Sequence, residues 1–121
     1  MANILVAEDE APLLEALKRV LTCSGHTVTA ADNGAAAIEL LKESVFDLVV
    51  LDMIMPDMDG FEVLDYIRGH SMKTPVLVMS GGGRRADFSF LQMAQQLGAN
   101  SVLKKPFRLA NLLKAVTRLL D

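Results

Sequence analysis

Short apolar runs alternate along the chain with longer segments in which apolar residues recur every three or four positions. Runs of the first kind are typical of buried β-strands, and the longer pattern is typical of amphipathic helices. The short runs predict strands at 3–7, 27–31, 47–51, 75–79 and 101–103. The longer segments predict helices from Pro12 to just before Gly25 and at 34–43, 61–68, 86–97 and 107–120.

Residues at the ends of these segments support the helix boundaries. Asp32 or Asn33 can cap the helix at 34–43, because short polar side chains accept hydrogen bonds from free backbone N–H groups. Asp59 and Gly60 can lead into the helix at 61–68 in the same way. Gly98 directly follows the helix at 86–97, where glycine commonly ends a helix.

Strict alternation of strands and helices predicts an α/β fold with a parallel sheet. Both faces of such a sheet are covered by helices, which explains why the strands read as continuous apolar runs. We expect a (βα)5 doubly wound sheet of five strands in the order 2-1-3-4-5, with right-handed crossovers. We expect residues 1–121 to form one domain.

Composition narrows the class of protein. The chain has 121 residues, is 51% hydrophobic and carries a formal net charge of −3, so no basic surface points to nucleic acid. Cys23 is the one cysteine, which excludes a disulfide or a cysteine metal site within the chain. The N-terminus lacks a basic segment before its acids, and no apolar run reaches the ~20 residues that span a bilayer. We therefore expect a soluble, cytoplasmic protein with no membrane partner.

Polar residues follow the predicted strands at the edge where ligands bind in doubly wound folds. In these folds the binding crevice lies beyond the carboxyl ends of the strands, near the point where the strand order reverses. Asp32 follows the second strand but would lie at the margin of the sheet. The groups expected to converge near the centre are Glu8, Asp9 and Glu10 after the first strand, Asp52 after the third, Ser80 after the fourth, and Lys104 and Lys105 after the fifth.

This set of groups suits phosphoryl transfer assisted by a metal ion. The carboxylates of Glu8, Asp9 and Asp52 would repel one another unless a divalent cation lay between them, and oxygen ligands of this kind suit Mg²⁺. Asp52 at a strand tip could attack a phosphoryl group, with Lys105 neutralising charge and Ser80 donating a hydrogen bond. The chain has no GxxxxGK[ST] motif, so the phosphoryl donor should come from another molecule.

The motifs that carry these residues resemble the response-regulator receiver domain, the CheY-like family with a flavodoxin-like fold. They are "ILVAEDE", "DLVVLDMIMPDMDG", "VLVMS" and "LKKPF", in order and over the whole chain. The resemblance implies that Asp52 is the phosphoacceptor and that Glu8 and Asp9 are the acidic pair. Mg²⁺ would be bound directly by Asp9, Asp52 and the backbone carbonyl of Ile54, and Glu8 would also reach the cation, through water. It also implies that Ser80 and Lys105 contact the phosphoryl group, and that the Lys105–Pro106 bond is cis.

The resemblance implies a signalling function rather than a turnover enzyme. The donor would be the phosphohistidine of a sensor histidine kinase or of a histidine phosphotransfer protein. Phosphorylation would change the face formed by the fourth helix, fifth strand and fifth helix, which a downstream protein reads. We expect a stand-alone receiver of this kind without direct nucleic-acid binding. The alternative is a degenerate receiver that acts as a phosphorylation-independent interaction module. A phosphatase with an Asp nucleophile would need a second acid two residues after it, where Ile54 stands.

The sequence departs from the usual receiver pattern at several positions. The acidic pair is Glu–Asp where Asp–Asp is commoner, and Ser80 stands where threonine is usual. Val102 occupies a position that is often aromatic, so the usual aromatic switch is not expected. Ile54 should overhang the site and hinder attacking water. The arginines at 84 and 85 could pair with phosphate or with an acidic partner, or simply begin a solvated helix.

Overall fold

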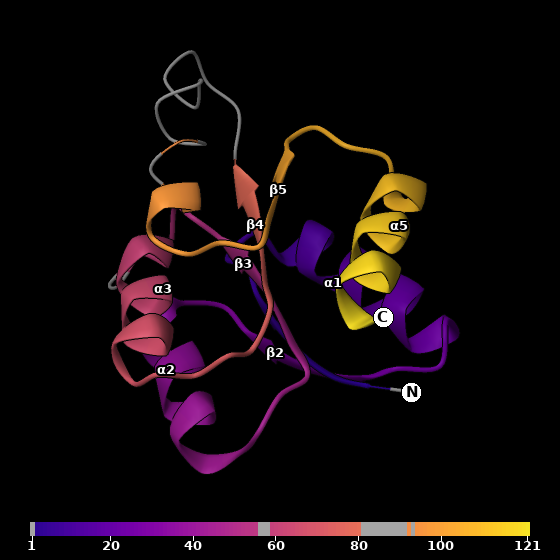
Figure 1. Ribbon diagram of the computed structural model, residues 1–121. Helices are drawn as coiled ribbons and strands as arrows, with labels where there is room; N and C mark the ends of the chain where they lie inside the picture. The colour runs from indigo at the N-terminus through magenta and orange to yellow at the C-terminus, as the bar shows by residue number, and fades with distance from the viewer. Residues whose placement is uncertain (1, 56–58, 81–91, 93) are drawn as a thin grey trace.

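Five parallel strands form one sheet with helices on both faces, in the order β2-β1-β3-β4-β5. The computed structural model describes residues 2–55, 59–80, 92 and 94–121. Figure 1 shows the sheet between two groups of helices, with β4 and β5 beside each other. The predicted α/β fold and strand order are therefore confirmed.

The elements have the following bounds. The strands are β1 (Asn3–Ala7), β2 (Thr27–Ala31), β3 (Leu48–Asp52), β4 (Val76–Ser80) and β5 (Ser101–Lys104). The helices are α1 (Ala11–Cys23), α2 (Gly34–Glu43), α3 (Gly60–Gly69) and α5 (Leu109–Leu120).

Three strands end later than the sequence predicted. The β3–β4 pairing includes Asp52 opposite Met79, and the backbone N–H of Met53 still donates to the carbonyl of Met79 at 3.1 Å. The β4–β5 pairing includes Ser80 opposite Lys104. Asp52 and Ser80 are thus the last residues of buried strands rather than the first residues of loops, which holds their backbones more firmly than a loop would.

The last helix begins two residues later than predicted. Arg108 has extended backbone angles and its carbonyl accepts hydrogen bonds from the N–H groups of Asn111 and Leu112. Residues 107 and 108 therefore lead into α5 and are not its first turn.

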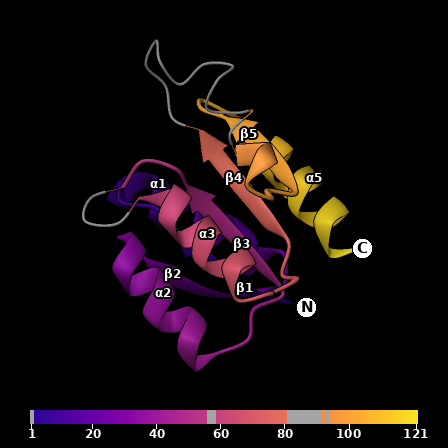
Figure 2. The same cartoon turned by 60° about the vertical axis from the view of Figure 1, so that its left-hand side comes forward.

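Each face of the sheet packs against helices through a separate apolar layer. The helices α2 and α3 cover one face and α1 and α5 cover the other, as the two views show (Figures 1 and 2). Every residue of β3 and β4 is buried, as expected for central parallel strands. The layer under α2 and α3 includes Leu5, Val49, Leu51, Val63, Leu64, Ile67 and Val78, and the layer under α1 and α5 includes Ile4, Val6, Leu17, Leu21, Val50, Leu77, Leu112 and Val116.

Side-chain caps fix the starts of two helices. The Oδ1 atom of Asn33 accepts from the N–H of Ala36 at 2.8 Å, so Asn33 rather than Asp32 caps α2. The Oδ1 atom of Asp59 accepts from the N–H of Glu62 at 3.1 Å at the start of α3, as the sequence predicted. These bonds use N–H groups that have no partner within the helix.

Arg68 joins the end of α3 to the segments that flank β4 and β5. Its guanidinium donates hydrogen bonds to four acceptors, which are the carbonyls of Met72, Thr74 and Gly98 and the Oδ1 atom of Asn100. The same Oδ1 atom also accepts from the N–H of Val76. Burial lowers the pKa of Arg68 below its usual value. The side chain therefore acts as a clamp between three segments, a role that the sequence alone did not suggest.

The predicted helix at 86–97 lies mostly outside the described residues. Gln92 and residues 94–96 are helical, and Gly98 follows them with a φ of +104°, in agreement with the predicted helix end. The arginines at 84 and 85 lie outside the described residues. Among the residues that the structure describes, none of the helices combines the length and apolar character needed to cross a membrane.

Candidate functional site

Four groups that are distant in sequence meet at the carboxyl edge of the sheet. Glu8 follows β1, Asp52 ends β3, Ser80 ends β4 and Lys105 follows β5. The side chains of Glu8 and Lys105, 97 positions apart, are in direct contact. The residues predicted from strand order therefore gather at one place, which is the edge where doubly wound folds bind ligands.

The ammonium group of Lys105 lies among three carboxylates. Its Nζ atom is 2.8 Å from Glu8 Oε1, 3.3 Å from Asp52 Oδ2 and 3.5 Å from Glu10 Oε1. The side chain of Glu10 is mostly exposed, whereas those of Glu8 and Asp52 are buried. Since the strength of an ion pair rises as water is excluded, the contacts with Glu8 and Asp52 dominate.

Glu8 is fully buried, and both of its carboxylate oxygens have partners. Oε1 accepts from Lys105 and Oε2 accepts from the backbone N–H of Glu10 at 2.9 Å. The backbone of Glu8 is also tied to the sheet, because its N–H donates to the carbonyl of Ala31. A buried charge needs this kind of compensation to be tolerated.

The environment raises the pKa of Asp52 to about 6. Burial is the largest cause and repulsion by Glu8 is the second, while Lys105 and the N–H of Ile54 act in the opposite direction. Burial alone would lower the pKa of Lys105, but its hydrogen bond with Glu8 and its attraction to Asp52 outweigh burial, so the pKa is raised. Near neutral pH the site therefore holds a lysine cation beside a carboxylate that is easily neutralised, by a proton or by another cation.

The acids of the site can accommodate a metal ion. Glu8, Asp9 and Asp52 each offer a carboxylate oxygen, and these oxygens lie within 4.8 Å of one another. The set contains only hard oxygen donors, which fit Mg²⁺ better than a softer metal. Asp9 is exposed while Glu8 and Asp52 are buried, so the group opens to solvent on the side of Asp9.

The start of α3 lies against the end of β3 and positions Asp52. A Cβ atom at Gly60 would clash with the backbone of Asp52 and of Met53. The N–H of Gly60 donates to the carbonyl of Met53 at 3.0 Å. Glycine is therefore required for the close approach of the helix to the acceptor strand.

Ile54 lies beside the carboxylate of Asp52 with an exposed side chain. Its N–H donates to Asp52 Oδ1 at 3.3 Å, and its relative exposure is 54%. A large, exposed apolar residue thus stands next to a buried acid, and the overhang of its side chain stays a prediction. Asp57 lies outside the described residues.

Ser80 and Lys105 are connected through the backbone. Ser80 is buried, and its carbonyl accepts from the N–H of Lys105 at 2.8 Å. The Lys105–Pro106 bond is cis, as the resemblance implied. Val102 packs half-buried against the layer under α2 and α3, so an aliphatic side chain occupies the position that is often aromatic.

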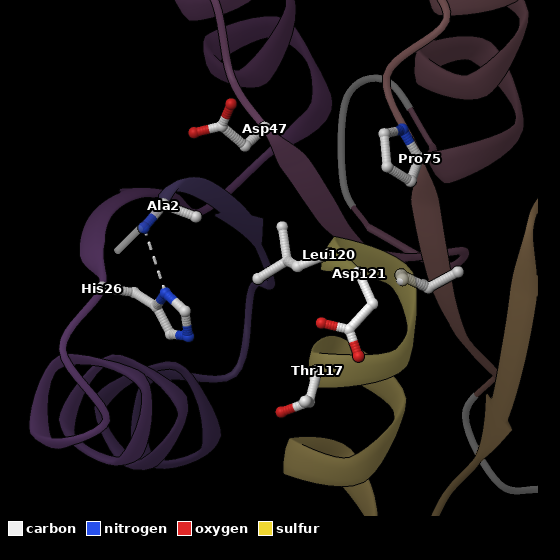
Figure 3. A pocket seen from close by; sticks show the side chains of 8 residues that line it. Ala2, His26, Asp47, Pro75, Thr117, Leu120 and Asp121 are labelled. Atoms are coloured by element: carbon white, nitrogen blue, oxygen red, sulfur yellow. Dashed lines mark hydrogen bonds between the residues drawn. The ribbon is translucent and has the colours of Figure 1, made fainter.

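A hollow of about 550 Å³ lies at the opposite end of the sheet (Figure 3). Ala2, His26, Asp47, Pro75 and Leu120 line it, and the N–H of Ala2 donates to His26 Nδ1 at 3.2 Å. These residues precede the strands or end α5, so the hollow is separated from the acidic site by the length of the sheet. It shares no lining residue with that site.

Comparison with known families supports the interpretation of the acidic edge, the carboxyl edge of the sheet where Glu8, Asp9 and Asp52 lie. The family model for the response regulator receiver domain matches residues 4–117, which is nearly the whole chain. The chain belongs to the response-regulator receiver family. The receiver is thus a domain of two-component signalling systems, and members of its family bind Mg²⁺ in an acidic pocket such as the one formed here by Glu8, Asp9 and Asp52.

The curated relatives are longer than this chain. The response regulator protein FleR of Pseudomonas aeruginosa is 39% identical over 117 residues, covering 97% of this chain and 24% of that protein. The transcriptional regulatory protein KdpE of Mycobacterium tuberculosis is 39% identical over 122 residues, covering 98% of this chain and 52% of that protein. The chain therefore spans about a quarter of the length of FleR and about half of the length of KdpE.

Solved receiver domains have the same fold. The receiver domain of the Francisella response regulator 1452 superposes with a TM-score of 0.91 at 26% identity, covering 99% of this chain and 97% of that one. The receiver domain of NtrX from Brucella abortus superposes with a TM-score of 0.88 at 28% identity and covers 97% of both chains.

Two residues help to shape the site although the sequence interpretation gave them no part in its chemistry. Glu10 contacts Lys105 and donates its N–H to Glu8, and its place directly after the acidic pair was a signal for this contact. Gly60 determines how closely α3 approaches Asp52, and its place at the end of the third-strand motif was the corresponding signal.

Proposed function

We propose that this receiver accepts a phosphoryl group on Asp52 from a partner phosphohistidine, with Mg²⁺ bound at the acidic edge. The observation that supports this proposal most directly is the contact of Lys105 with Asp52 at 3.3 Å, next to two further acids. An acceptor carboxylate, a cation for the developing charge and ligands for a metal ion are thus present within one site.

The positions of these groups support the following course of phosphoryl transfer to Asp52. A carboxylate oxygen of Asp52 attacks the phosphorus atom and forms a P–O bond, while the P–N bond of the phosphohistidine breaks. The bonding electron pair stays on the imidazole nitrogen of the donor. Lys105 neutralises charge on the phosphoryl oxygens, and Ser80 at the end of the neighbouring strand donates a hydrogen bond from its hydroxyl. Asp9, Asp52, the carbonyl of Ile54 and Glu8 are the proposed surroundings of Mg²⁺, which reduces the charge of the transferring group when bound.

We propose two kinds of partner for this chemistry. The donor is a sensor histidine kinase or a histidine phosphotransfer protein, and the exchange takes place in the cytoplasm. The output is a downstream protein that reads the face around β5 and α5. In this region Lys104 is exposed at the end of β5 and the rest of β5 is half-buried, which leaves surface for a partner. Neither direct nucleic-acid binding nor turnover catalysis is part of the proposal.

Phosphorylation by a small donor tests the proposal without knowledge of the kinase. The protein is incubated with phosphoramidate and Mg²⁺, and the intact mass is measured. We expect one phosphoryl group on the wild type and none on Asp52→Asn. The matched control is Asp32→Asn, since Asp32 is an exposed acid that follows β2 at the same edge. Equal labelling of wild type and Asp52→Asn would refute the assignment. A wild type that takes no label would instead fit a phosphorylation-independent interaction module.

A further inference from the structure

Positive charge is concentrated in the segment that ends β5 and forms most of α5. Residues 104–118 contain five of the twelve lysines and arginines and no acid, although the chain has a formal net charge of −3. The acids lie mainly elsewhere, since thirteen of the fifteen precede residue 66. β2 and β5 are the two edges of the sheet, and α5 lies on the side of the molecule away from α2 (Figures 1 and 2). The side of the molecule next to β5 therefore carries an excess of positive charge.

Four of these five bases are exposed to solvent. Lys105 is the exception, because its ammonium contacts Glu8 and Asp52. The four are Lys104, Arg108, Lys114 and Arg118, which together we call the basic face. Among the residues that the structure describes, no acid forms an ion pair with any of them. The lysines of α1 and α2 differ, since Lys18 and Lys42 each lie 3.7 Å from a glutamate of the same helix.

Two members of the basic face project from the outer side of α5. Lys114 and Arg118 are four positions apart, so they are neighbours on the surface of the helix. Each follows a fully buried residue, Leu112 or Val116, by two positions. Two positions correspond to more than half a turn, so both side chains lie on the side opposite to the core. Their charges are thus available to a molecule that approaches from solvent.

A second hollow, of about 470 Å³, lies on this outer side of α5. It is lined by Leu113, Lys114, Thr117, Arg118 and Asp121. Two cations and a hydroxyl can bind carboxylates, and the half-buried Leu113 offers an apolar contact between them. This combination fits a peptide in which acids are interspersed with an apolar residue.

The position of Arg108 is unfavourable for the stability of α5. Arg108 stands at the cap position before the helix, its side chain makes no capping hydrogen bond, and the first turn contains no acid. The N-terminal end of a helix carries partial positive charge, so an acid is stabilising there and a base is not. Residues that break such a local rule are candidates for a functional role. An anionic group of a partner would compensate both the arginine and the helix end.

We propose that the basic face docks an acidic segment of a partner protein, with an apolar residue of that segment against Leu113. The inference rests on the proposed function only in that the docked protein is taken to be the output partner. A protein segment fits better than a nucleic acid, because the chain as a whole is negative and Asp121 at the hollow would repel a phosphate backbone. Complementary charge speeds the encounter and selects among partners.

Binding of a glutamate-rich peptide tests the proposal on the unphosphorylated protein. The peptide carries fluorescein and a leucine among its glutamates, and its dissociation constant is measured by fluorescence anisotropy at low salt. The combined substitutions Lys114→Gln and Arg118→Gln should raise this constant about tenfold, because two charged contacts are lost. The matched control combines Lys18→Gln and Arg19→Gln, which remove the same charge from α1 and should have little effect. Equal weakening by both pairs, or a wild type that does not bind the peptide, would overturn the proposal.

A further variant separates docking from stability. Arg108→Asp should lower the urea unfolding constant about fivefold, since aspartate can cap α5 and suits the positive end of the helix. The same variant should bind the peptide about tenfold more weakly, because it reverses a charge of the basic face. Weaker binding by a more stable protein cannot result from unfolding. Peptide binding as tight as that of the wild type would contradict the proposal.

A fluorescein-labelled DNA duplex is the second probe. Weaker binding of the duplex than of the peptide at the same salt concentration supports a protein partner. Tighter binding of the duplex that is lost with Lys114→Gln and Arg118→Gln would show that the basic face binds nucleic acid, and the proposal would be wrong.

These measurements do not depend on phosphorylation of Asp52. If the peptide binds at the basic face and Asp52 takes no label, the docking surface stands and the proposed function fails. If Asp52 is labelled and the peptide does not bind, the proposed function stands and the docking surface is refuted.

Discussion

The buried carboxylate of Asp52 lowers the stability of the metal-free receiver, and Asp52→Asn should remove this effect. The pKa of Asp52 is raised from 3.8 to about 6 in the folded protein. One unit of pKa corresponds to about 1.4 kcal/mol, so ionisation of Asp52 destabilises the fold by up to about 3 kcal/mol. Asparagine has nearly the same shape, can still accept from the N–H of Ile54 and carries no charge. Lys105 keeps its closer partner Glu8 in this variant.

The sign of the effect follows from which state binds the proton more tightly. The folded state has the higher pKa, so between pH ~4 and pH ~6 it holds a proton that the unfolded chain has already released. Wild-type stability from this group therefore falls as pH rises through that range and then levels off. Asp52→Asn should match the wild type near pH ~4 and exceed it by up to about 3 kcal/mol above pH ~7.

Urea unfolding in EDTA, followed by far-UV circular dichroism, measures this difference directly. The chain has no tryptophan, so a backbone signal is the natural probe. Asp65→Asn is the matched control, because Asp65 is an exposed acid on α3. If Asp52→Asn is no more stable than the wild type at pH ~7.5, or if the difference does not grow between pH ~4.5 and pH ~7.5, the reasoning from burial is wrong. Addition of Mg²⁺ should stabilise the wild type more than the variant, since a bound ligand stabilises the folded state.

Three further substitutions test other parts of the structure. Gly60→Ala should lower the free energy of urea unfolding by about 1–3 kcal/mol and slow phosphorylation, because the added methyl group has no room against Asp52. The control Gly69→Ala, which has open space around it, should change neither. Ile54→Asn should shorten the life of the aspartyl phosphate, measured by loss of label after donor removal, because water gains access; equal decay rates would contradict this. Arg68→Met should destabilise the fold by about 2–4 kcal/mol, since it leaves several acceptors unpaired, and an unchanged urea midpoint would exclude the clamp.

The sequence predicted the fold well because the apolar periodicity of each element is a local signal, and strict alternation of strands and helices leaves few possible orders for a parallel sheet. The bounds of β1 and β2 agree with the prediction, and the cap of α2 was narrowed to two candidates, of which Asn33 is the one used. The ends of β3 and β4 were each placed one residue early. Asp52 and Ser80 are polar and were placed directly after their strands, whereas the pairing of neighbouring strands extends the sheet through them.

The gathering of site residues was also predictable, but their individual contacts were not. Strand order alone brings Glu8, Asp52 and Lys105 to one edge of the sheet. Which carboxylate holds the ammonium depends on side-chain reach and on burial, and these appear only when the chain is packed. The contacts of Arg68 were missed for the same reason, because its acceptors are mainly backbone carbonyls from distant segments.

The contact between Glu8 and Lys105 has a consequence for folding. It joins positions 97 residues apart, near the beginning and near the end of the chain. Contacts of such long range form only after the intervening segments are largely in place, and they tend to make folding slow. A partly folded receiver with β1 and β3 paired would have its acids but not its lysine. Labelling of Asp52 is therefore expected to report completion of the whole fold, and a refolding chain should regain its helical signal before it can be labelled.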